Sequence, residues 1–211
     1  MKTELEFKWS AGTYEDFSRF VKTSRRFGAS AGPEEKLRNR DYYLDTPSAT
    51  LRAAGKAARI RDTGTRWEFT VKSDTEFRDG MARRNEQTFP LETDGTASFA
   101  LKHLKSGLLR EKGLDLPFEY LGEIFTIDTR RRQRLIEMPG GTRALATFDD
   151  SKINAGDLEG YLREIEFELV EGNEQGFKNF AKKTSVTAEL KPCRLSKVAA
   201  AYSLLDGTVS F

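Results

Sequence analysis

The chain of 211 residues has little cysteine, histidine and apolar material, and each shortage excludes a class of protein. Its single cysteine, Cys193, has no partner for a disulfide within the chain, which fits a reducing compartment. Its single histidine, His103, cannot form a His/Cys cluster of the kind that holds zinc or a softer metal. Hydrophobic residues make up only 37% of the chain and charged residues 32%, so the chain is rich in charge.

Long apolar runs are also missing, and the mean hydropathy is -0.61. A membrane-spanning helix needs about 20 consecutive apolar residues, so no membrane partner is expected. No apolar segment opens the chain, so we expect no secretory signal and a cytoplasmic protein. The net charge of +2 is too close to balance for a general nucleic-acid binder, and no nucleic-acid partner is expected. The distribution of the charges is therefore more informative than their sum.

Charged and apolar side chains alternate at several places with a period of two, which is typical of a β-strand. Glu4, Glu6 and Lys8 share one face of the first such segment, and the apolar residues between them share the other. The pattern returns with acidic residues at 164–168 and with the opposite sign at 59–61. Strands with buried apolar faces and densely charged opposite faces predict a barrel with a charged interior.

The sequence predicts a single α+β domain over residues 1–211, an eight-stranded antiparallel β-barrel with covering helices. Thr13 and Asp16 form a capping pair for a helix that should end near Phe27 and Gly28. Turns are expected at 62–65 and 139–141. After the first strand, the expected strands are residues 37–44, 57–61, 67–72, 83–89, 123–138, 142–148 and 162–170. The later helices are expected at residues 97–109, 175–183 and 196–205.

The first of these later helices, at 97–109, should bury one apolar face against the sheet. The residues expected on that face are Phe99, Leu101, Leu104 and Leu108. His103 lies in this helix, where a surface or capping role is more usual than that of a general base.

Carboxylates occur in pairs two residues apart, so both members of a pair project from one face of a strand. Mg²⁺ prefers oxygen ligands, usually one or two carboxylates together with water and substrate phosphates. The pairs are Glu4 with Glu6 and Glu166 with Glu168, and the further candidates are Glu86, Asp149 and Glu164.

Basic residues follow the same alternation. Guanidinium groups match phosphate oxygens with two parallel hydrogen bonds, and lysine adds a point charge. A cavity with carboxylates on one wall and basic residues on the others suits a metal-bound polyphosphate, because buried charges need partners. The basic candidates are Lys8, Arg59, Arg61, Lys72, Arg84, Arg130, Arg132 and Lys197.

Three simpler interpretations stay open at this point. Charged residues that alternate on a strand most often mark the solvated face of an antiparallel sheet. The run 130–132 with Arg134 is also compatible with a small nucleic-acid or localisation patch. Cys193 has no nearby histidine partner in the sequence, which favours a packed or incidental thiol over a nucleophile.

An ordered set of motifs resembles one known family. The opening block Glu4-Leu5-Glu6-Phe7-Lys8 has the form ExExK, and further blocks follow along the chain. These are Tyr42-Tyr43-Leu44-Asp45-Thr46, Leu51-Arg52, Ala58-Arg59-Ile60-Arg61, Phe69-Thr70-Val71-Lys72, Arg84 with Glu86, Asp149, Glu164-Ile165-Glu166-Phe167-Glu168, and Ser196-Lys197. In identity and order they resemble the CYTH superfamily, the triphosphate tunnel metalloenzymes, over essentially the whole chain.

The resemblance implies an eight-stranded tunnel that binds a triphosphate and Mg²⁺ or Mn²⁺. It implies catalytic roles for Glu4, Glu6, Lys8 and Lys72, with Lys197 closing the C-terminal side of the tunnel. The phosphate-binding residues it implies are Lys8, Arg59, Arg61, Lys72, Arg84, Lys197 and an arginine of 130–134. The metal ligands it implies are Glu4, Glu6, Asp149, Glu164, Glu166 and Glu168.

The family pattern leaves open which arginine of 130–134 faces the tunnel, because it can also be placed on Arg131. We expect Arg130 and Arg132 inside, since Phe125, Ile127 and Leu135 would then face outward.

Members of this superfamily include inorganic triphosphatases, thiamine triphosphatases and class IV adenylyl cyclases. The C-terminal segment from Ser196 to Leu204 looks most like bacterial inorganic triphosphatases. The resemblance therefore implies metal-dependent hydrolysis of a small-molecule triphosphate, with tripolyphosphate as the expected substrate. The alternatives are a cyclase that converts ATP to cyclic AMP and a non-catalytic polyphosphate-binding module.

Overall fold

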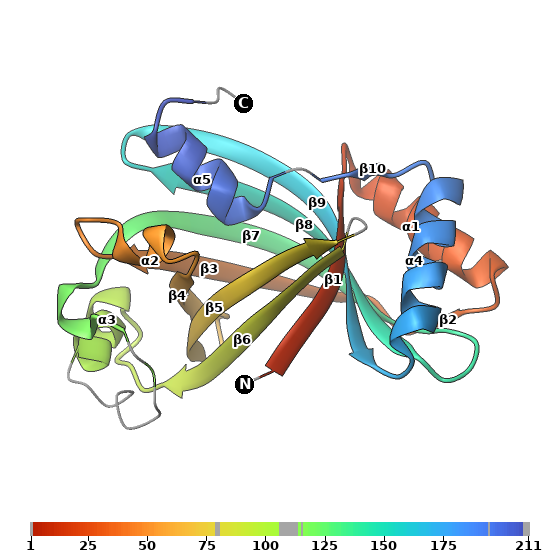
Figure 1. The fold of residues 1–211 in the computed structure, drawn as a ribbon, viewed down its shortest axis with the longest axis horizontal. Coiled ribbons are helices and arrows are strands. Elements are labelled where there is room, and N and C mark those ends of the chain that lie inside the picture. Colours follow the sequence, from red (N-terminus) through yellow and green to blue (C-terminus); the bar gives the residue numbers. More distant parts are fainter. Residues whose placement is uncertain (1, 79–80, 106–113, 115, 194, 209–211) are drawn as a thin grey trace.

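Eight antiparallel strands close into a barrel in the computed structural model, which describes residues 2–78, 81–105, 114, 116–193 and 195–208 (Figure 1). Their order is β1-β6-β5-β4-β3-β7-β8-β9, and β1 pairs with β9 to complete the circle. The barrel strands are β1 (Lys2–Ser10), β3 (Glu35–Asp45), β4 (Ala57–Asp62), β5 (Trp67–Arg78), β6 (Met81–Leu91), β7 (Gly122–Glu137), β8 (Arg143–Ala155) and β9 (Leu158–Glu171). Two short strands extend the sheet, β2 (Ser30–Ala31) beside β7 and β10 (Lys191–Pro192) beside β1. The predicted α+β barrel is confirmed.

Helices cover the barrel at several places, as expected. The helices are α1 (Tyr14–Arg26), α2 (Thr50–Ala53), α3 (Ala97–Lys105), α4 (Glu174–Thr187), α5 (Lys197–Leu205) and the short 3-10 helix η2 (Phe118–Tyr120). In Figure 1, α1 and α4 lie together at one end of the barrel, and α2 and α3 lie at the other. Among the described residues, none of the helices combines the length and the apolar character that crossing a bilayer requires.

The largest apolar cluster lies between the barrel and the pair α1 and α4. Because side chains alternate on β1, its apolar residues face outward while its charged residues face inward. Trp9 packs on Phe20 of α1 with ring centroids 5.4 Å apart, and Phe7 packs on Phe177 of α4 at 5.7 Å. The predicted cap of α1 is confirmed, since the Asp16 carboxylate accepts the backbone N–H of Thr13.

A second cluster lies beneath α3 and η2, where Leu104 and Phe118 pack over the outward residues of β4 and β5. Leu104 is fully buried, as expected, and Leu101 is partly buried. The expectation for Phe99 was wrong, because its side chain is 41% exposed and stacks on His103. Leu108 lies outside the described residues.

Helix α5 differs from the others because it packs against inward-facing residues of the barrel. Its Ala200 and Leu204 join a buried cluster with Phe125 of β7 and Ile153 of β8. Figure 1 shows α5 lying across β8 and β9. At this end the inner face of the barrel is therefore apolar, whereas nearer its middle the inner face carries charges.

Several strands run further than their apolar patterns indicated. β8 continues to Ala155, well beyond the expected end at 148, because its polar residues pair with β9 as far as Leu158. The connecting turn contains Gly156 with φ 61°, a left-handed conformation that glycine adopts without steric cost. The turn expected at 139–141 is confirmed, with positive φ at both of its glycines.

Candidate active site

A cavity of about 950 Å³ occupies the barrel interior and is lined mainly by charged side chains. They come from β1, β4, β5, β6, β7 and β9, from α2 and the segment that follows it, and from the start of α5. The charged residues that line it are Glu4, Lys8, Arg52, Lys56, Arg59, Arg61, Lys72, Arg84, Glu86, Arg131, Glu166, Glu168 and Lys197. Segments far apart in sequence thus contribute opposite charges to one enclosed space.

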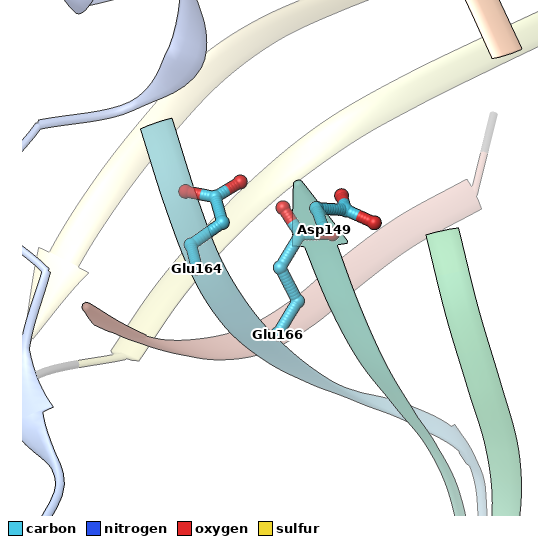
Figure 2. Close-up of side chains that lie close together, drawn as sticks. All are labelled: Asp149, Glu164 and Glu166. Carbon is cyan, nitrogen blue, oxygen red and sulfur yellow. The ribbon is translucent and has the colours of Figure 1, made fainter. Parts of the chain in front are cut away.

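Three carboxylates form the tightest acidic group in the described residues. Asp149, Glu164 and Glu166 each offer an oxygen within 4.8 Å of the others. Figure 2 shows Glu164 and Glu166 on β9 and Asp149 on the neighbouring strand β8. Asp149 and Glu164 are directly opposite in the β8–β9 register, so strand pairing itself brings the group together.

Burial and the neighbouring cations together give the three carboxyl groups different proton affinities. Burial raises the pKa of Glu164, and the nearby Lys197 and Lys8 only partly oppose this effect. Burial acts in the same direction on Glu166, but Lys197, Lys8 and Arg131 outweigh it and hold its pKa well below the usual range. The pKa of Asp149 is also lowered, because Arg131 and Lys197 outweigh its burial.

The acidic group fits a divalent metal by two criteria. Hard cations take carboxylate oxygens, and three of them converge here without any histidine or cysteine in the group. One buried oxygen of Glu164, Oε1, accepts no hydrogen bond of regular geometry from any described residue, although Lys8 and Lys197 are close enough to form ion pairs with it. Asp149, Glu164 and Glu166 would therefore hold the ion.

Three basic side chains surround this acidic group. Lys8 is opposite Glu166 in the β1–β9 register and donates to it at 2.5 Å. Arg131 donates to Asp149 at 2.7 Å and to Glu166 at 2.9 Å. Lys197 donates to Asp149 at 2.6 Å, so the first residue of α5 reaches the same point. The charges are thereby balanced within the barrel wall.

The two acidic residues in the middle of β1, Glu4 and Glu6, lie beside basic residues of β5 and β6. Arg84 donates through Nε to Glu4 at 2.6 Å and contacts Glu6, and Lys72 lies 3.1 Å from Glu4. Burial would raise the pKa of Glu4, but Lys72 and Arg84 lower it to about 2. Glu6 is directly opposite Glu168 of β9, which places a further carboxylate pair on this wall.

One buried carboxylate at the site was missed by the sequence reasoning. Asp41 of β3 is fully buried and accepts two hydrogen bonds from Arg61, at 2.6 and 2.7 Å. Arg59 lies 3.5 Å from the same carboxylate. Burial would raise the pKa of Asp41, but the two arginines lower it to about 2. Asp41 lies directly opposite Arg61 because of the register between β3 and β4. The pattern of residues along one strand does not reveal that register.

The expectation that Arg130 and Arg132 face the tunnel was wrong, because Arg131 occupies that place. The β7–β8 register puts Arg131 opposite Asp149, and Arg130 is exposed. Arg132 faces outward and lies over the ring of Tyr14, with its guanidinium carbon 4.1 Å from the ring centroid.

The error has a clear physical cause in the position of α5. Phe125 and Ile127 were expected to face away from the tunnel because they are apolar. They share the inward face with Arg131, since α5 covers the inner surface of β7 there and makes it apolar.

The other predicted residues lie in the same interior, but not all of them line the cavity itself. Glu6, Asp149 and Glu164 lie behind the cavity surface and contact the basic residues that line it. Glu86 lines the cavity and lies 2.8 Å from Lys72.

A closed barrel that encloses carboxylates among lysines and arginines is suited to an anion complexed with a divalent metal. The chain belongs to the CYTH domain family, which matches residues 2–202. It is 30% identical over 166 residues to an inorganic triphosphatase from Haemophilus influenzae. That stretch is 77% of this chain and 44% of the relative, so the match spans less than half the length of the curated relative.

Solved structures share the fold at low identity. A putative adenylyl cyclase from Hippeastrum, described as having a dominant triphosphatase activity, matches with a TM-score of 0.63 and 16% identity over 98% of this chain and 97% of that one. A putative adenylate cyclase from Bacillus halodurans matches with a TM-score of 0.59 and 21% identity over 93% of this chain and 96% of that one. The mimivirus capping-enzyme triphosphatase matches with a TM-score of 0.51 and 11% identity over 90% of each chain. At these identities the likeness shows the fold alone.

Proposed function

We propose that this protein hydrolyses inorganic tripolyphosphate with the help of Mg²⁺ or Mn²⁺. The observation that carries the proposal is the juxtaposition of the acidic group on β8 and β9 with basic residues from the opposite walls of one cavity. The similarity to an inorganic triphosphatase supports the same substrate class.

The basic residues would bind the phosphate chain. Arg59, Arg61 and Lys72 lie on one wall of the cavity and Arg131 on another, so a chain of phosphates between them would meet positive charge from both sides. Phosphoryl transfer is accelerated mainly by positioning and by neutralising charge on the phosphate oxygens. Fixed ion pairs such as Arg61 with Asp41 hold these groups in place before the substrate arrives.

The carboxylates would hold the metal, with Asp149, Glu164 and Glu166 on β8 and β9 and Glu4, Glu6 and Glu168 beside them on β1 and β9. When bound, a divalent ion supplies charge neutralisation on the phosphate and activation of water. The chain's own contribution is to hold Glu166 and Asp149 close together and ionised, through their ion pairs with Lys8 and Lys197.

The cavity offers little for a nucleoside. Its aromatic residues are already engaged in packing, since Tyr43 stacks on Phe125 at 4.8 Å and Tyr202 packs edge-on against the same ring. The Tyr202 hydroxyl donates to Asp45 at 3.1 Å. Binding energy should therefore come mainly from the phosphates. A non-catalytic polyphosphate-binding module would not need the clustered carboxylates.

The test is an activity panel that combines Mg²⁺, Mn²⁺ and no metal with tripolyphosphate, ATP and thiamine triphosphate. We expect phosphate release from tripolyphosphate with kcat/KM well above that for ATP, and no cyclic AMP. Formation of cyclic AMP and pyrophosphate from ATP at a comparable rate would instead establish the class IV adenylyl cyclase.

Substitutions separate the two kinds of residue. Glu6→Gln and Glu168→Gln should raise the Mg²⁺ concentration needed for activity, because each removes a negative charge from the metal side. Arg59→Ala and Lys72→Ala should lower kcat/KM for tripolyphosphate by about 10²–10³-fold, as is usual for groups that stabilise developing charge. Near-normal rates in all four variants would refute the proposed chemistry.

A further inference from the structure

The outer surface of the barrel carries basic residues that the tunnel does not use. On β3 and β7, Arg38 and Arg130 face outward and are directly opposite each other in the strand register. Both side chains are exposed, and within the described part of the chain neither forms an ion pair with a carboxylate. Asp150 is the cross-strand neighbour of Arg130 on β8, but it is bound at 2.9 Å by Arg163.

This pair lies in a surface groove of about 610 Å³, the outer groove. Two further carboxylates of the groove are also engaged, since Asp128 lies 3.5 Å from Arg40 and Asp62 accepts the backbone N–H of Gly64. The basic residues of the outer groove are Arg38, Arg40, Arg130, Lys152 and Arg163. The excess charge of the groove is therefore positive and is concentrated at Arg38 and Arg130.

Like charges directly opposite on a sheet destabilise it, and a bound anion would remove this repulsion. Residues two apart on a strand are about 6.6 Å apart, so Arg38 and Arg40 present a row of guanidinium groups along β3. Guanidinium groups bind phosphate oxygens bidentately, as they also bind carboxylates. An extended anion with regularly repeated phosphates matches such a row.

We propose that the outer groove binds an extended inorganic polyphosphate chain, at a site separate from the tunnel. The choice of ligand rests on the proposed function, because it takes the substrate class of the tunnel and lengthens it. Single-stranded nucleic acid is less well matched, because its binding sites stack successive bases on aromatic rings. Tyr161 is the one aromatic residue among the described residues that line the groove.

The test measures binding of long-chain inorganic polyphosphate to the full chain in the presence of a chelator, so that no hydrolysis occurs. Arg38→Glu/Arg130→Glu should weaken binding by about tenfold or more and flatten the dependence of log K on log salt, since two phosphate contacts are lost. Arg38→Gln/Arg130→Gln should show a smaller loss in the same direction. Arg25→Glu/Arg26→Glu, which changes two exposed arginines on α1, is the matched control and should bind nearly as the unaltered chain does.

A tunnel variant distinguishes binding in the outer groove from binding in the tunnel. Arg59→Ala/Lys72→Ala should still bind the long chain, because the outer groove is intact. If that variant loses binding while the Arg38/Arg130 variants keep it, the polyphosphate binds in the tunnel and the proposal is wrong. Equal binding of a single-stranded RNA of the same charge would also overturn it. Because no turnover is measured, absence of tripolyphosphate hydrolysis would refute the proposed function and leave this result unaffected.

Discussion

Asp41 illustrates how a buried residue outside the recognised motifs can organise the site. It has no described contact with the acidic group on β8 and β9, yet it holds Arg61 by two hydrogen bonds and lies near Arg59. An arginine with fixed geometry loses less entropy when it binds a phosphate than one that is free to rotate. Asp41 is thus expected to act as a positioning residue for the phosphate-binding wall.

The first prediction concerns the pH dependence of stability at Asp41. Its pKa is lowered from 3.8 to about 2, so its ionisation stabilises the fold fully above about pH 4. This stabilisation, about 2 kcal/mol, should be lost as the pH falls from about 4 towards 2. Asp41→Asn should be less stable near neutral pH and should lose correspondingly less stability over that acid range. Urea unfolding at a series of pH values measures this, and parallel curves for the two proteins would contradict it.

The second prediction concerns the arginine run. Arg131→Ala removes the guanidinium that binds Asp149 and Glu166, so kcat/KM for tripolyphosphate should fall by about 10²–10³-fold. Arg132→Ala is the control from the adjacent position, because Arg132 faces outward over Tyr14. Its kcat/KM should stay near the original value. Steady-state kinetics on both variants, with unfolding curves to confirm that each folds, decide the matter; equal losses would argue against the tunnel position of Arg131.

At the scale of elements, α5 both closes the inner face of the barrel and contributes to the site. Ser196 caps the helix by accepting the backbone N–H of Ala199, and the next residue, Lys197, reaches Asp149. The apolar residues of the helix pack on β7 and β8. Correct placement of Lys197 therefore depends on packing at the other end of the same helix.

A pair of neighbouring leucines tests how firmly α5 is packed on the barrel. Leu204 is 5% exposed and Leu205 is 43% exposed. Leu204→Ala should lower the free energy of unfolding by about 2–5 kcal/mol, because it leaves a cavity beneath α5. Leu205→Ala should change it by no more than about 0.5 kcal/mol. Chemical denaturation measures both, and a similar small loss in the two variants would show that α5 is not firmly packed.

For the whole molecule, the interior concentrates acidic and basic residues that a metal and an anion would further satisfy. A bound divalent ion would neutralise charge on the phosphate, so chelation should abolish tripolyphosphate hydrolysis, and Mg²⁺ or Mn²⁺ should restore it. A ligand that binds only the folded state also stabilises that state, by an amount that grows with the logarithm of the ligand concentration relative to its Kd.

The same ions should raise the Tm, measured by thermal unfolding with and without metal. Glu164→Gln should reduce this rise, because it removes one carboxylate of the acidic group. Glu171→Gln, at the exposed end of the same strand, should leave it unchanged. A Tm that does not respond to metal in the unaltered chain would argue against a metal site among these carboxylates.

The strands and their charged faces could be predicted because side-chain alternation is a local property of an extended backbone. Glu4 and Glu6, or Arg59 and Arg61, share a face whatever the rest of the chain does. The polar second half of β8 and the short strands β2 and β10 lacked an apolar pattern, and only their pairing with neighbours defines them.

By itself the sequence thus determined which residues share a strand face, the number of barrel strands and the charge of the interior. Which strands are neighbours, and in what register, was decided by the tertiary structure. That register sets Asp41 against Arg61 and Arg131 against Asp149. The direction of Arg131 also depends on α5, more than 60 residues later in the chain, which buries apolar residues on the inner face of the same strand. Apolar character shows that a side chain is buried, but only the packed structure decides against which surface.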